Sequence, residues 1–164
     1  MANPLTIVKY PQPVLLKKAK PVESVTKDIV HLIPQMEKIM EFHEGIGLAA
    51  PQVGDSRQII IVKGNTQNHA FLNPAILKKS KKQISDEEGC LSLPDIFLKI
   101  KRSEEVEVFA QTPKGKAVRI VAKGLAARIF QHEIDHLQGI LIIHRANPLK
   151  RIWDSLKIYK NKGY

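Results

Sequence analysis

The segment His-Glu-Ile-Asp-His at residues 132–136 constrains the fold of this chain more than any other feature. On a helix, residues four apart lie about one turn apart on the same face, so both imidazoles can bind one metal ion. Leu125 and Ile129 continue that stripe toward the N-terminus, which predicts that the face is buried or lines a pocket. The pattern therefore predicts a helix over 124–138 that carries a metal site, with Glu133 beside the metal as a general base.

Hydrophobic periodicity elsewhere predicts strands in the middle of the chain and helices toward both ends. The expected strands are 58–63, 69–77, 96–101 and a hairpin formed by 104–111 and 116–122. The expected outer helices are 26–43 and 148–161, and Pro34 should kink the first or break it into two pieces. Residues 45–54 are expected to form a loop, and 4–22 an extended segment. We expect an α+β fold of mixed or antiparallel strands packed around the central motif helix, as a single domain over 1–164.

Charge and cysteine content narrow the class of protein. The chain has 26 Lys and Arg against 16 Asp and Glu, and its net charge of +10 favours an anionic partner such as RNA or the ribosome. Aromatic residues make up only 5% of the chain, too few for a base-stacking platform, so we expect no DNA partner. The absence of a long apolar run and the single cysteine predict a cytoplasmic protein that spans no membrane.

The third metal ligand decides which kind of metal site this is. A thermolysin-like protease would use a later glutamate, but Glu133 is the last glutamate in the chain. A metzincin would place a third histidine where this chain has Ile142. Cys90 is therefore the best candidate to join His132 and His136. One thiolate and two imidazoles leave a coordination position open for water, as in catalytic zinc sites.

A third segment, 45–52, is rich in glycine and alanine. Its glycines allow another backbone or a substrate to approach closely, and Gln52 can supply a side-chain amide donor. Taken by itself, the segment is equally typical of a tight turn against the core.

Together the three segments resemble the motifs of the peptide deformylases. These are Gly-x-Gly-x-Ala-Ala-x-Gln at 45–52, Glu-Gly-Cys-Leu-Ser at 88–92, and Gln-His-Glu-x-Asp-His-Leu-x-Gly at 131–139. The resemblance extends over nearly the whole chain. It implies an enzyme that removes the N-formyl group from the formyl-methionine of newly synthesised polypeptides and releases formate. It also implies Fe²⁺ as the metal in the cell, with Zn²⁺, Ni²⁺ or Co²⁺ able to occupy the same site.

The resemblance also implies roles for individual residues. Glu133 is expected to act as the general base, and the side-chain amide of Gln52 and the backbone N–H of Leu91 to stabilise the oxyanion. Cys90, His132 and His136 are expected to bind the metal. The substrate is expected to contact five further residues: Ile46, Gly47, Gly89, Leu125 and Ile129.

The chain departs from the family pattern at three positions. Phe97 stands where some relatives have an arginine near the substrate, His144 where an aspartate is frequent, and Pro34 is unusual in the first helix. None of them is a metal ligand or the base. We expect a monomer, with the basic helix at 148–161 as a candidate contact to the ribosome.

Two other functions remain open at this point. One is a metallopeptidase that cuts internal bonds, and the other is a non-catalytic module that binds RNA or the ribosome. A peptide assay separates the first from a deformylase, and metal stoichiometry near zero would favour the second.

Overall fold

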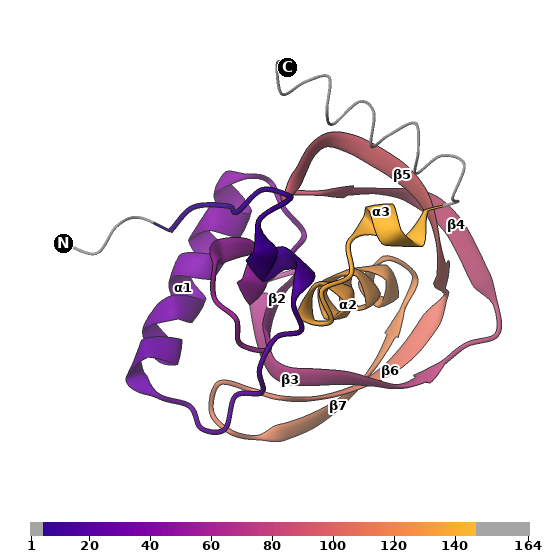
Figure 1. Ribbon diagram of the computed structural model, residues 1–164. Helices are drawn as coiled ribbons and strands as arrows, with labels where there is room; N and C mark the ends of the chain where they lie inside the picture. Colours follow the sequence, from indigo (N-terminus) through magenta and orange to yellow (C-terminus); the bar gives the residue numbers. More distant parts are fainter. Residues whose placement is uncertain (1–4, 147–164) are drawn as a thin grey trace, which may run out of the picture.

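Strand β2 (Ile59–Lys63) shows how the core is built, because four of its residues are buried in succession. Ile60 and Val62 contribute to one hydrophobic cluster, with helix α2 (Gly124–Leu137). Ile59 and Ile61 contribute to a second cluster, with helix α1 (Lys27–Phe42). A strand that alternates between two such clusters lies between two apolar layers, which explains its unbroken β-branched run. The computed structural model describes residues 5–146, and Figure 1 shows strands wrapped around the central α2.

Within residues 5–146, the strands β1 to β7 pair antiparallel and form two sheets. The larger sheet has the order β1-β2-β3-β6-β7. Its remaining strands are β1 (Gly47–Ala49), β3 (Asn68–Lys79), β6 (Glu105–Gln111) and β7 (Ala117–Lys123). The smaller sheet pairs β4 (Gln83–Cys90) with β5 (Leu93–Ser103). The expected α+β class, the antiparallel pairing and the hairpin of β6 and β7 are confirmed.

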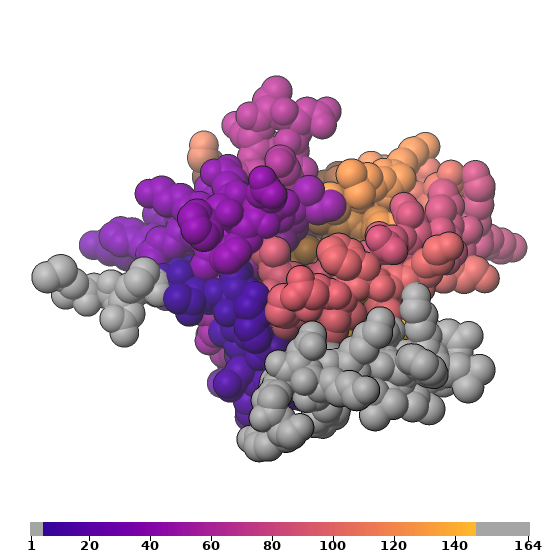
Figure 2. Space-filling view, turned by 90° about the horizontal axis from the view of Figure 1, so that it is seen from above, coloured from indigo at the N-terminus to yellow at the C-terminus, as the bar shows by residue number. Residues whose placement is uncertain are grey.

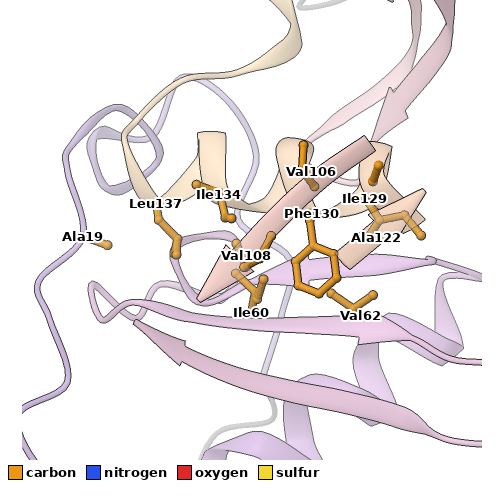
Figure 3. Packing of buried hydrophobic residues seen from close by; sticks show 12 residues of the cluster. Ala19, Ile60, Val62, Val106, Val108, Ala122, Ile129, Phe130, Ile134 and Leu137 are labelled. Carbon is orange, nitrogen blue, oxygen red and sulfur yellow. The ribbon is translucent and has the colours of Figure 1, made fainter. Parts of the chain in front are cut away.

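Helix α2 packs its apolar side against the larger sheet. Figure 3 shows Phe130 and Ile134 of the helix beside Val106, Val108 and Ile60 of the strands. Because that side of the helix is held by close packing, the position of the neighbouring histidine face is fixed as well.

Helix α1 runs from Lys27 to Phe42 without a break at Pro34, so the expected alternative of two separate pieces is wrong. Thr26 is its N-cap residue. The proline removes the hydrogen bond that the carbonyl of Val30 would accept, but Val30 is 51% exposed and Pro34 is also exposed. That carbonyl can therefore bond to water, and the helix tolerates the proline on its solvent side.

Other expectations are also corrected. Residues 45–54 do not form a simple loop, because they contain β1 and the short helix η2 (Ala50–Val53). The N-terminal segment includes the short helix η1 (Pro13–Leu16), and β4 was not predicted at all. After α2 comes the short helix α3 (Ile142–Arg145), in which His144 Nδ1 accepts the N–H of Leu141 at 3.0 Å. The helix expected over 148–161 lies outside the described residues.

Candidate active site

A cavity of about 620 Å³ opens between the start of β1, the strand pair β4–β5 and the first turns of α2. Figure 2 looks onto this face, where the orange surface of α2 is seen between purple and pink surfaces. The cavity is lined by ten of the residues singled out from the sequence: Ile46, Gly47, Gln52, Gly89, Cys90, Leu91, Leu125, Ile129, His132 and Glu133. His136, the eleventh of these residues, is not part of the lining. It is 1% exposed and contacts Cys90 behind the cavity wall.

The side-chain stripe on α2 leads from the mouth of the cavity to its floor. Leu125 in the first turn is 62% exposed, whereas Ile129 is 6% exposed. The His132 side chain is 12% exposed, and His136 is fully enclosed by protein. The helix thus presents apolar surface at the entrance and two imidazoles at depth, as the periodicity predicted.

Three side chains that could hold one metal ion meet at this floor. A ligand atom from each of Cys90, His132 and His136 lies within 4.8 Å of the other two. Cys90 Sγ is 3.2 Å from His136 Nε2. Burial lowers the pKa of His136, and the charges of His132 and Arg102 lower it further, so the ring is neutral and can bind a metal.

The polar atoms around the floor also fit an additional bound group. Among the described residues, the buried side-chain atoms that lack a hydrogen-bond partner are Glu133 Oε2 and His136 Nδ1. Buried polar groups are normally satisfied, so the unsatisfied Glu133 Oε2 fits a site completed by an ion and water, whereas His136 faces Cys90 with Nε2 and not with Nδ1.

Glu133 is buried beside this cluster and packs against a glycine. A Cβ added to Gly47 would lie 2.4 Å from Glu133 Oε1 and 2.8 Å from Ile129 Cγ2. Only glycine therefore allows strand β1 to lie this close to the carboxylate. Burial raises the pKa of Glu133 to about 7, although the nearby His132 opposes the shift. A carboxylate with that pKa can both accept and return a proton near neutral pH.

Gln52 is held so that its amide nitrogen faces the thiol. Its Oε1 accepts the backbone N–H of Ala49 at 2.8 Å, which orients the amide. Its Nε2 lies 3.5 Å from Cys90 Sγ and 3.4 Å from Ser92 Oγ. The side chain is 2% exposed, so this donor is fixed in place before any ligand arrives.

Glu88 connects the metal cluster to two arginines. Its carboxylate contacts His132 Nδ1 at 3.0 Å, Arg102 at 2.9 and 3.0 Å, and Arg128 at 2.6 Å. Burial alone would raise the pKa of Glu88, but the hydrogen bonds from His132 and Arg102 outweigh it and hold the pKa at about 2. The ionised Glu88 fixes the orientation of the His132 ring, as partners of metal-binding histidines commonly do.

The charged network continues to the other side of α2. Arg102 Nη1 also donates to Asp135 Oδ2 at 2.5 Å. Asp135 in turn accepts two hydrogen bonds from Arg145, at 3.0 and 2.6 Å. Strand β5 and the motif helix are therefore joined by buried, charge-assisted hydrogen bonds, and the half-exposed Arg145 extends the network to α3.

Replacing Arg102 with Leu should lower the free energy of unfolding by about 3 kcal/mol, because Glu88 and Asp135 would stay buried with fewer partners. Urea unfolding monitored by circular dichroism measures the change. Arg119→Leu is the matched control, since Arg119 also pairs with a glutamate, Glu107, but its side chain is 65% exposed. It should cost less than about 1 kcal/mol. Equal losses in the two variants would show that the buried network adds no special stability.

Several functional neighbours were not assigned roles from the sequence. Glu88 and Asp135 lie within two of the family motifs but carry no predicted role, and Arg102, Arg128 and Arg145 lie outside the three motifs. Their partnership depends on the register of β4 and β5, in which Ile84 pairs with Arg102 and Glu88 pairs with Leu98. The sequence carries no periodic signal for these pairings, and it shows only that Glu88 and Asp135 lie inside motifs.

Comparisons with known proteins agree with this geometry. Residues 4–152 match the family model for polypeptide deformylases. A peptide deformylase of Dictyoglomus turgidum is 46% identical over 142 residues, which cover 87% of this chain and 92% of that protein. The crystal structure of peptide deformylase from Thermotoga maritima has a TM-score of 0.86 at 41% identity, covering 90% of this chain and 100% of that one. A peptide deformylase from Synechococcus elongatus in complex with actinonin has a TM-score of 0.89 at 36% identity, covering 96% of this chain and 87% of that one. Sequence and fold thus lead to the same family over most of the chain.

Proposed function

This chain belongs to the peptide deformylase family and removes the N-formyl group of newly synthesised polypeptides by metal-dependent hydrolysis, and we propose that Cys90, His132 and His136 hold its metal ion. The observation that carries the proposal is the meeting of one thiol and two imidazoles within 4.8 Å at the floor of a cavity. When bound there, a divalent ion lowers the pKa of water toward neutrality, so that hydroxide is available at pH 7.

Glu133 is the proposed general base. Its buried carboxylate accepts the proton of the attacking water and later donates it to the leaving amine, so one group serves both stages. The pKa of about 7 and the contact with Gly47 support this role, because the carboxylate is poised for proton transfer and confined to one position.

Gln52 Nε2 and the backbone N–H of Leu91 are the proposed donors to the formyl oxygen as it becomes negatively charged. Gln52 is already oriented by Ala49, and Leu91 follows Cys90 directly at the cavity wall. Removing one such donor typically raises the barrier by about 3–4 kcal/mol.

The substrate is proposed to bind in an extended form between β1 and β4. Gly47 and Ile46 lie at the start of β1, which is an edge strand of its sheet and can bond to a peptide backbone. Gly89 faces them from β4, while Leu125 and Ile129 supply apolar surface for the methionine side chain. A floor this tightly packed around Gly47 also favours the formyl group over the larger acetyl group.

We further propose Fe²⁺ as the metal in the cell, because a thiolate with two imidazoles accepts Fe²⁺ as well as Zn²⁺, Ni²⁺ or Co²⁺. A thiolate–iron site open to solvent is sensitive to oxidation at the metal and at the sulfur. Activity of the iron-loaded protein should therefore decay in air and be preserved by catalase, whereas the nickel- and zinc-loaded protein stays active. Peptide turnover, measured repeatedly over several hours in air, reports the stability of each form. Equal stability of all three forms would contradict this proposal.

The ribosome is the proposed macromolecular partner, since the substrate is a nascent chain and the protein carries a net charge of +10. The cytoplasm is the compartment that this implies, and no helix of residues 5–146 is long and apolar enough to cross a membrane. Replacing Lys157, Lys160 and Lys162 with Glu should weaken co-sedimentation with ribosomes and reduce its dependence on salt. Turnover of a short free peptide should change little. Unchanged ribosome binding of this variant at low salt would contradict the proposal.

A further inference from the structure

Three large apolar side chains remain exposed around the cavity. Ile46 is 44% exposed, Phe97 is 60% exposed and Leu125 is 62% exposed, and all three line the cavity wall. Leu125 already has a proposed partner in the methionine side chain of the substrate, and Ile46 has one in the peptide backbone. Phe97 has none, and exposed apolar side chains gathered at one cavity are typical of a ligand-binding groove.

Phe97 is on strand β5, and its ring reaches the cavity by lying over the neighbouring strand β4. It pairs with Gly89 in the register of β4 and β5. A Cβ added to Gly89 would lie 2.7 Å from Phe97 Cε1 and 3.0 Å from Cδ1. The missing side chain at Gly89 therefore lets the ring lie directly over the backbone of β4, on the face that borders the cavity.

The path of the substrate determines what meets this ring. Under the proposed function, the formyl group lies at the floor near Cys90, and the methionine side chain lies against Ile129 and Leu125. The peptide then leaves between Gly47 and Gly89 toward the mouth. The exposed ring over Gly89 consequently faces residues that come after the methionine.

The charged residues at the mouth of the cavity also affect which substrate residues can follow the methionine. Asp86, Glu87 and Asp95 are exposed and line the cavity on the side of β4 and β5. On that side they repel acidic side chains, the exposed Lys9 is a cation in the same lining, and the ring of Phe97 offers apolar surface.

We propose that Phe97 is a specificity-determining residue that selects substrates with an apolar side chain at one of the two positions after the formyl-methionine. The proposal rests on the proposed function. It assigns to one side chain a preference that the backbone contacts of an extended peptide cannot supply, because those contacts are the same for every sequence.

The test compares kcat/KM for formyl-Met-X-Ser and formyl-Met-Ala-X, with X as Leu, Ala or Asp. The wild-type protein should prefer Leu over Ala by about tenfold at one of the two positions, as expected for burying an apolar side chain. Phe97→Ala should reduce that ratio to near one, and Phe97→Arg should raise the relative rate for Asp. Phe97→Leu, which keeps apolar surface, should retain part of the preference. The matched control is Phe109→Ala, because Phe109 is a half-exposed phenylalanine on β6 outside the cavity; it should keep the wild-type ratio.

The outcomes separate this inference from the function on which it rests. If the wild-type protein releases formate from formyl-Met-Ala-Ser but Phe97→Ala and Phe97→Arg keep the wild-type Leu-to-Ala ratio at both positions, the specificity role is wrong. If the wild-type protein releases no formate from any of these peptides, the proposed function fails instead.

Discussion

Replacing Glu133 with Gln should lower kcat for a formylated peptide by at least about 100-fold, because glutamine cannot accept the proton of the attacking water. The substitution keeps the shape of a side chain that packs against Gly47, so the fold and the metal content should stay close to those of the wild type. Steady-state kinetics together with elemental analysis of the same sample measure both quantities.

Glu107→Gln on β6 is the matched control, since it makes the same chemical change outside the cavity. It should keep nearly full activity. More than a tenth of the wild-type activity in Glu133→Gln, at equal metal content, would show that another group takes the proton.

Replacing Cys90 with Ser should remove most of the bound metal and with it the activity. A hydroxyl is a poor ligand for a divalent transition metal, and only two imidazoles would remain at the floor. Changes to partners outside the ligand set already cost about 10–100-fold in metal affinity, so loss of a direct ligand should cost at least about 100-fold. Competition with a chromogenic chelator, using nickel-loaded protein, reports the affinity independently of turnover.

The variant must remain folded for this result to count, and Cys90 is at the end of β4 beside a well-packed cluster. Circular dichroism and the midpoint of urea unfolding of the metal-free proteins provide that check. A folded Cys90→Ser protein that binds one nickel ion with wild-type affinity would show that Cys90 is a core residue and not a metal ligand.

The elements predicted correctly from the sequence are those whose burial pattern is regular. Helix α2 has apolar residues at helical spacing, and β6 alternates Val106, Val108 and Ala110 toward the core. Strand β4 has neither signal, because none of its eight positions carries a buried apolar residue and its sequence is rich in Asp and Glu. It is a strand because β5 lies beside it along its length, which periodicity within one segment cannot reveal.

The same distinction applies to the site. The residues within motifs could be found because their spacing along the chain has chemical meaning. The network of Glu88, Arg102, Asp135 and Arg145 joins a strand pair to two helices, so its members are separated by up to 57 positions between Glu88 and Arg145. Only the packing of these elements shows that they orient His132 and stabilise the floor of the cavity.

The central claim is that this cavity hydrolyses the formyl group of a peptide and leaves the peptide bonds intact. The most direct measurement uses protein purified without air, with its metal counted, and compares formyl-Met-Ala-Ser with Met-Ala-Ser. The account predicts one formate released for each Met-Ala-Ser formed, no cleavage of the unformylated peptide, and a rate proportional to the bound metal. Cleavage of an internal bond, or absence of formate from protein that holds one metal ion per chain, would contradict it.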